Sequence, residues 1–107
     1  MLSTHILDIA AGRPAAGVTV RVAAFEGDGW RPIGTGVTDD DGRIADLLDG
    51  DTLARGEYRL IFEVESYLGD EAFYPEVVIV FRVAEPGEHH HVPLLLGPFG
   101  YTTSRGS

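Results

Sequence analysis

Apolar side chains recur at every second position along much of this chain. Segments 18–24 and 57–64 both alternate in this way, which places their apolar side chains on one face of an extended strand. Segment 77–83 is almost continuously apolar and β-branched, as is typical of a strand covered on both faces. A further strand begins near His89 and continues to Leu96. Because proline has no N–H to donate, we expect Pro93 at a sheet edge or a bulge.

Turn-forming residues separate these apolar runs. Clusters rich in glycine, proline and aspartate recur about every 8–12 residues, a spacing that is typical of an all-β sandwich or barrel. Residues 65–69 predict one helical turn that ends at Gly69. We expect a single domain over residues 1–107, with strands near residues 4–9, 17–25, 31–38, 43–47, 57–64, 75–84, 89–96 and 100–105.

Charge and hydropathy exclude several function classes. The 107 residues include 8 basic and 17 acidic side chains, which gives a net charge of −9, and every basic residue is arginine. A chain this acidic repels phosphate backbones and shows no basic stripe, so we expect no nucleic-acid partner. The longest purely apolar run, residues 77–81, is far too short to cross a bilayer, so we expect no membrane partner either.

Cysteine is absent from the sequence. This excludes disulfide bonds, a thiolate nucleophile and a cysteine-bound metal. Residues 1–5 lack the basic start and apolar block of a signal peptide. We therefore expect a cytoplasmic protein.

Histidine is the side chain best suited here to chemistry near neutral pH, because its ordinary pKa is about 6.5. The four histidines are His5, His89, His90 and His91. In an extended segment, His89 and His91 point to one face and His90 to the other. On spacing alone, the three consecutive histidines are most simply polar residues at the start of a strand. A zinc site built from His5, His89 and His91 is the weaker alternative, because no third ligand is close in sequence.

The acidic turn at residues 39–43 offers a second candidate. Its three aspartates resemble the start of a calcium loop, but the sixth and twelfth positions, which need glycine and glutamate, hold Ile44 and Gly50. A tight turn ending in Gly42 fits better. Arg43 then opens the next strand and offers planar donors for carboxylate or carbonyl oxygens. An ion pair between Arg43 and the adjacent aspartates is an equal alternative.

Three blocks of sequence occur in a recognisable order. The first is LSTHILD at residues 2–8, followed by GRPAAG at residues 12–17, and the second is TDDDGR at residues 38–43. The third is HHHVPLLLGPFGYTTSRGS at residues 89–107. It matches a family pattern His-x-His-Val-Pro-Leu-Leu-Leu that ends in Tyr-Arg-Gly-Ser. Across essentially its whole length, the sequence resembles the transthyretin-like 5-hydroxyisourate hydrolases of urate breakdown.

This resemblance implies a fold and an assembly. The fold is an all-β, prealbumin-like or transthyretin-like sandwich of two four-stranded sheets with one short helix, in agreement with the strand count above. The assembly is a homotetramer, a dimer of dimers, whose active sites lie in a channel between the dimers.

The resemblance also implies the residues of the site. Carried over position by position, the catalytic groups fall on His5, Arg43, His91 and Ser107. The substrate-binding groups fall on His5, Arg43, Ser104, Arg105 and Gly106. The family tyrosine that precedes Arg-Gly-Ser is replaced by Ser104, which is too short to take the place of a phenol that reaches toward the substrate. Neither a metal nor an organic cofactor is implied.

The implied activity is hydrolytic opening of the 5-hydroxyisourate ring to 2-oxo-4-hydroxy-4-carboxy-5-ureidoimidazoline. His5 and His91 would activate a water, one as base and the other to orient the water or protonate the leaving nitrogen, and either assignment is open. Arg43 would stabilise the developing oxyanion, and Ser107 would hold a histidine or the water. The alternatives are a non-catalytic small-molecule carrier on the same scaffold, favoured by Ser104, and a β-sandwich interaction module.

Overall fold

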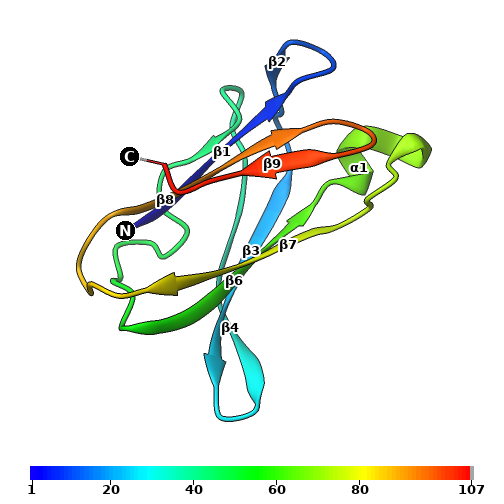
Figure 1. Ribbon diagram of the computed structural model, residues 1–107. Helices are drawn as coiled ribbons and strands as arrows, with labels where there is room; N and C mark the ends of the chain where they lie inside the picture. Colours follow the sequence, from blue (N-terminus) through cyan, green and yellow to red (C-terminus); the bar gives the residue numbers. More distant parts are fainter. Residues whose placement is uncertain (107) are drawn as a thin grey trace.

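The strands of this protein form two sheets that pack face to face, as a computed structural model shows for residues 1–106 (Figure 1). The elements are β1 (Leu2–Asp8), β2 (Arg13–Pro14), β3 (Thr19–Glu26), β4 (Gly29–Val37), β5 (Arg43–Ile44), β6 (Gly56–Glu63), α1 (Glu65–Leu68), the 3₁₀ turn η1 (Gly69–Glu71), β7 (Val77–Val83), β8 (His90–Leu96) and β9 (Tyr101–Thr103). In the described chain, no helix has the length and apolar character needed to cross a membrane.

The two sheets have the strand orders β2-β1-β8-β9 and β4-β3-β6-β7. The two-residue strand β5 also joins the first sheet by pairing with β1. β1 and β8 run parallel, although they lie at opposite ends of the sequence, and Figure 1 shows them side by side. The expected all-β sandwich of two four-stranded sheets with one short helix is therefore confirmed, with β5 as an additional short strand.

The core lies between the inner faces of the sheets, where the alternating apolar positions meet. Its most deeply buried side chains are Leu2, Ile6, Val18, Val20, Val22, Leu60, Phe62, Val64, Val77, Val83, Leu94 and Leu96. The expectation that segment 77–83 is covered on both faces is wrong for this chain. Val78 and Val80 are 41% and 57% exposed, because no other part of residues 1–106 covers the outer face of β7.

Pro93 lies inside β8, which has neighbours on both sides, rather than at a sheet edge. The amide of His90 donates to the carbonyl oxygen of Met1, just before β1, so alternation directs the nitrogen of Pro93 toward β9. The ladder between β8 and β9 stops at the pair Leu94–Thr103 and resumes in the same register as an isolated bridge between His91 and Gly106. The missing N–H of Pro93 therefore divides the expected strand 100–105 into a short β9 and a separate bridge.

The expected strand 43–47 is shortened to β5, because the chain turns inward after Ile44. The carboxylate of Asp46 accepts hydrogen bonds from the amides of Leu2, Leu48 and Gly50 at 3.3, 3.1 and 2.8 Å. These bonds replace the strand pairing that would otherwise satisfy the backbone.

The predicted helical turn is confirmed as α1, which Gly69 ends with a φ of 80°.

Asp8, the last residue of β1, joins the strand to α1. Its carboxylate accepts hydrogen bonds from the amides of Ala10 and Ala11 at 3.0 and 2.8 Å and from the hydroxyl of Tyr67 at 2.7 Å. Burial by itself raises the pKa of this carboxyl, but these bonds and the charge of Arg13 hold it below its ordinary value. Asp8 is therefore ionised in the folded protein and fixes α1 against the end of β1.

Replacing Tyr67 by phenylalanine removes one hydrogen bond to this carboxylate. We expect Tyr67→Phe to lower the free energy of unfolding at neutral pH by about 1.5 kcal/mol. Because the pKa of Asp8 is lowered in the folded state, its contribution is present above the ordinary carboxyl pKa and is lost as the pH falls through the lowered value. The deficit measured by urea unfolding should therefore shrink in acid. Tyr74→Phe, at an exposed tyrosine, is the matched control.

Candidate functional site

Three of the predicted catalytic side chains come from three neighbouring strands of one sheet. β1 supplies His5, β5 supplies Arg43 and β8 supplies His91. In the strand register, His5 is opposite Arg43, and Ser3 is opposite His91. Because side chains alternate across a strand and the intervening residues point into the core, these four side chains share the outer face of the sheet. The structure therefore brings His5, Arg43 and His91 together as predicted.

Ser3 contacts two histidines at once. Its Oγ lies 2.7 Å from Nδ1 of His91 and 2.8 Å from Nε2 of His89. The two imidazole rings have centroids 6.4 Å apart. Ser3, His5, Arg43, His89 and His91 are named below as the outer-face cluster.

His91 lies in an environment that disfavours its charged form. Partial burial lowers the pKa of His91 most, and the positive charges of Arg43, His89 and His5 lower it further, while a hydrogen bond with the backbone of Ser3 acts in the opposite direction. The resulting pKa lies below the ordinary value of about 6.5. The imidazole of His91 is therefore neutral at neutral pH and able to accept a proton.

His90 takes no part in the cluster. Its side chain points to the opposite face, as predicted, where it is 4% exposed and its Nδ1 lies 3.0 Å from the carbonyl oxygen of Glu88. Its ring centroid lies 6.5 Å from that of Phe81. His90 is thus a core residue, and only His89 and His91 of the three consecutive histidines face the site.

The bridge at Gly106 brings the end of the described chain onto His91. The amide of Gly106 donates to the carbonyl oxygen of His91 at 2.8 Å. A Cβ atom at Gly106 would overlap Cδ2 of the His91 ring and would lie 3.3 Å from Cδ of Pro93. Glycine is therefore the residue that lets the backbone pack directly against the imidazole.

The other residues predicted for substrate binding are placed differently. Ser104 is exposed and lines a hollow of about 180 Å³ together with His90, His91 and Arg105. The guanidinium of Arg105 forms an ion pair with Glu88, with Nη2 and Oε1 2.6 Å apart, so the segment before β8 holds it. Ser107 lies outside the described residues, and its role stays a prediction.

Two members of the outer-face cluster were missed as site residues by the sequence reasoning. Ser3 was not singled out, and His89 was given no catalytic role. The signal available for Ser3 was its position two residues before His5, which puts both side chains on one face of a strand. The pairing of β1 with β8, which brings Ser3 to His91, has no local signal in the sequence.

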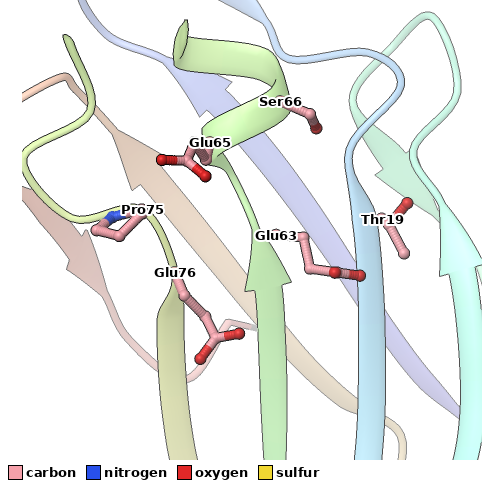
Figure 2. A pocket seen from close by; sticks show the side chains of 6 residues that line it. All are labelled: Thr19, Glu63, Glu65, Ser66, Pro75 and Glu76. Atoms are coloured by element: carbon pink, nitrogen blue, oxygen red, sulfur yellow. The ribbon is translucent and has the colours of Figure 1, made fainter. Parts of the chain in front are cut away.

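A second hollow, of about 490 Å³, lies on the other sheet and is acidic (Figure 2). Figure 2 shows Glu63 at the end of β6 between Glu76 and Thr19, with Glu65 at the start of α1. The guanidinium of Arg21 lies 3.4 Å from Glu63 and 3.9 Å from Glu76. Across residues 1–106, no group of three or more histidine, aspartate or glutamate side chains is arranged to hold a metal ion. The outer-face cluster is therefore the candidate site.

Residues 2–106 match the HIUase/Transthyretin family. The chain belongs to this family. It is 44% identical over 110 residues to the 5-hydroxyisourate hydrolase of Salmonella dublin, in a match that covers 100% of this chain and 81% of the relative. It is 42% identical over 111 residues to the 5-hydroxyisourate hydrolase of Mus musculus, covering 99% of this chain and 94% of the relative.

Two solved structures of family members superpose closely on this chain. The Klebsiella pneumoniae 5-hydroxyisourate hydrolase has a TM-score of 0.87 and 38% identity, covering 99% of this chain and 97% of that structure. Sea bream transthyretin in complex with thyroxine has a TM-score of 0.88 and 35% identity, covering 98% and 93%. The expected transthyretin-like fold is confirmed. Since a hydrolase and a thyroxine-binding protein both have it, the fold alone does not assign the activity.

The close contact at Gly106 predicts that even a methyl group there displaces His91. We expect Gly106→Ala to break the hydrogen bond between Ser3 and His91, seen as a change in the His91 ring resonances, and to cost about 1–3 kcal/mol of stability from overpacking. Gly100→Ala is the matched control, because a Cβ at Gly100 meets nothing within 4 Å. Unchanged His91 resonances in Gly106→Ala would contradict the packing described here.

Arg43 lowers the pKa of His91 through its positive charge, so removing that charge must raise the pKa. We expect Arg43→Gln to move the pKa of His91 up toward about 6.5 in an NMR titration. Arg31→Gln, which removes an arginine paired with Glu26 on the other sheet, should leave the His91 titration unchanged. A His91 pKa that falls in Arg43→Gln would overturn this account of the site.

Proposed function

We propose that this protein is a 5-hydroxyisourate hydrolase, which opens the ring of its substrate to 2-oxo-4-hydroxy-4-carboxy-5-ureidoimidazoline in urate degradation. The observation that carries the proposal is the convergence of His5, Arg43 and His91 on one face of the sheet. The match to hydrolases of that name over essentially the whole chain supports the same conclusion.

In this proposal, His91 is the general base that activates the attacking water. Its lowered pKa keeps the imidazole neutral at neutral pH, and its ring is held in place by Ser3 and Gly106. A positioned base of this kind contributes about 10²–10⁴-fold to a rate. His5, which is opposite Pro93 in the register, then orients the water or protonates the leaving ring nitrogen.

Arg43 is the group proposed to bind carbonyl oxygens and to stabilise the oxyanion that forms on the attacked carbon. Its side chain is exposed, and within residues 1–106 it forms no ion pair. Asp39, one of the adjacent aspartates, instead accepts hydrogen bonds from the amides of Asp41 and Arg43 at 2.9 Å. The guanidinium is thus available to the substrate, which favours the binding role over the alternative ion pair.

The segment from Ser104 to Ser107 is proposed to complete the substrate site. Gly106 packs on His91, and Ser107 is assigned the task of holding a histidine or the water. Arg105 would exchange its exposed partner Glu88 for the substrate, an exchange of low cost because such surface pairs contribute about 0–1 kcal/mol. Ser104 leaves open the space that the family tyrosine would fill.

We further infer that the protein is a cytoplasmic homotetramer, a dimer of dimers, in which a second copy covers the cluster. In a single chain the site faces water, where charges interact weakly. Exposed apolar side chains lie on the same sheet and its loops, with Leu95, Ile9 and Phe99 at 38%, 61% and 75% exposure. Burying them against another copy would close the site into a channel and strengthen the action of Arg43.

A non-catalytic carrier is the second candidate function. It is favoured by Ser104 and by the superposition on the thyroxine complex of sea bream transthyretin. It is disfavoured by the outer-face cluster, whose imidazoles and guanidinium suit proton transfer and oxyanion binding. Saturable binding of a small molecule without turnover would identify a carrier.

The hydrolase proposal predicts rapid loss of 5-hydroxyisourate absorbance when the substrate is generated in place from urate by a urate oxidase. We expect decay well above the spontaneous rate with the wild-type protein, and a loss of about 10²-fold or more in His91→Ala. Arg43→Lys should also lose activity although its charge is kept, because the planar pair of donors is lost.

Two controls make this measurement decisive. Buffer alone gives the spontaneous rate, and sedimentation of the same sample reports whether the protein is a folded tetramer. Decay no faster than buffer, from a folded tetramer, would overturn the hydrolase proposal in favour of a carrier. Wild-type kcat/KM in Arg43→Lys would overturn only the role given to Arg43.

A further inference from the structure

Ser3 is the one member of the outer-face cluster that contacts two imidazoles through a single atom, at 2.7 Å from His91 and 2.8 Å from His89. We propose that Ser3 is a positioning residue that fixes which ring nitrogen of His91 carries the proton, with His89 as the far end of the hydrogen-bond chain. The proposal rests on the hydrolase function above, in which His91 is the base. It adds Ser3 and His89 to the machinery of the site.

The number of protons on a serine hydroxyl limits the hydrogen bonds that Ser3 can make. Ser3 has one proton to donate, so Oγ donates to one of the two histidines and accepts from the other. When both rings are neutral, the hydrogen bonds that link His91, Ser3 and His89 can run in either of two directions. Either His91 donates to Ser3 and Ser3 donates to His89, or His89 donates to Ser3 and Ser3 donates to His91.

Only the first direction leaves His91 able to act as a base. There Nδ1–H of His91 donates to Ser3, so Nε2 has a free lone pair for the proton of the attacking water. Ser3 then donates to Nε2 of His89, whose own proton is on Nδ1. In the reverse direction, Nδ1 of His91 accepts from Ser3 and Nε2 carries the proton, which leaves no free lone pair on the ring.

The surroundings of His91 show why a serine is needed at this point. A histidine base is commonly oriented by a carboxylate or carbonyl that accepts its second N–H. The charged groups that act on His91 within residues 1–106 are Arg43 from β5, His5 from β1 and His89 from the segment before β8, and none of them is a carboxylate. The Ser3 oxygen is therefore the acceptor that this face supplies.

The position of Ser3 is well fixed. It is 7% exposed, and it is opposite His91 in the parallel ladder between β1 and β8. Gly106 packs on the other edge of the His91 ring at Cδ2. Held from both edges, the ring keeps Nδ1 on Ser3 and leaves Nε2 on its free side.

The hydrogen bond from Nδ1–H of His91 to Ser3 also stabilises the charged form of His91. When Nε2 takes a proton from the water, the hydroxide adds to the substrate carbonyl and His91 becomes an imidazolium with N–H groups on both nitrogens. Nδ1–H still donates to Ser3, and donation from Ser3 to His89 strengthens that bond by polarising the hydroxyl. No proton has to leave Nδ1.

The first test is nitrogen NMR of the resting protein, which needs no turnover. We expect ¹⁵N shifts that show both His91 and His89 protonated at Nδ1 and unprotonated at Nε2, since Nδ1–H of His91 donates to Ser3 and Nε2 of His89 accepts from Ser3. In Ser3→Ala, His91 should become a mixture of both tautomers, whereas Ser3→Thr, which keeps the hydroxyl, should retain one. A proton found on Nε2 of His91 in the wild type, or a tautomer unchanged in Ser3→Ala, would overturn the proposal.

The second test separates positioning from packing by kinetics. We expect Ser3→Ala to lower kcat by about tenfold or more with little change in KM, and Ser3→Thr to recover most of it. The acidic limb of the kcat profile should move to lower pH in Ser3→Ala, because the imidazolium form of His91 loses the Ser3 oxygen that accepts its Nδ1–H. An acidic limb that stays in place with unchanged kcat would contradict the role of Ser3.

His89 provides a test at an exposed position, where a substitution does not disturb the core. His89→Ala should lower kcat, and His89→Gln should retain more activity, because its amide oxygen still accepts from Ser3. The double variant Ser3→Ala/His89→Ala should lose no more than Ser3→Ala alone, since His89 acts only through Ser3. Additive losses would overturn the proposed hydrogen-bond chain.

The NMR test also separates this proposal from the hydrolase function. Absence of turnover in the wild type, together with the expected NMR tautomer, would reject the hydrolase function alone.

Discussion

β1 and β8 lie side by side in a parallel ladder that runs from Leu2 opposite His90 to Asp8 opposite Leu96, and the site depends on this register. It places Ser3 against His91 and sends His90 into the core. A shift by one residue would exchange the two faces of β8, so that His91 pointed inward and His90 outward. The buried apolar side chains of both strands prevent that shift, so the core that stabilises the sandwich also aligns the outer-face cluster.

The charge of the site is opposite to the charge of the chain. The protein as a whole has a net charge of −9, yet the side chains gathered around His91 are arginine and histidine. Among the carboxylates nearest to Arg43 in sequence, that of Asp39 accepts hydrogen bonds from the backbone amides of Asp41 and Arg43. This local reversal favours oxygen-rich ligands and lowers the pKa of His91, two effects that a uniformly acidic surface could not provide.

The family to which the chain belongs contains proteins with different activities on one sandwich. Sea bream transthyretin in complex with thyroxine and the Klebsiella pneumoniae hydrolase superpose on it almost equally well, with TM-scores of 0.88 and 0.87. The difference in activity must therefore lie in the side chains rather than in the arrangement of the strands. In this chain those side chains include Ser3, whose hydroxyl is hydrogen-bonded to both His89 and His91 and joins the two imidazoles.

The sequence by itself determined the strands, because alternation and turn residues are local properties; it also identified His5, Arg43 and His91 through their motifs. It placed α1 at residues 65–69 and His90 on the face opposite His91. It did not show that β7 is exposed on its outer face, that Pro93 interrupts the ladder to β9, or that Arg105 pairs with Glu88. Only the tertiary structure decided that Ser3 meets His91, 88 positions later in the chain, because strand pairing over such a distance is selected by the packing of the whole core and leaves no local pattern.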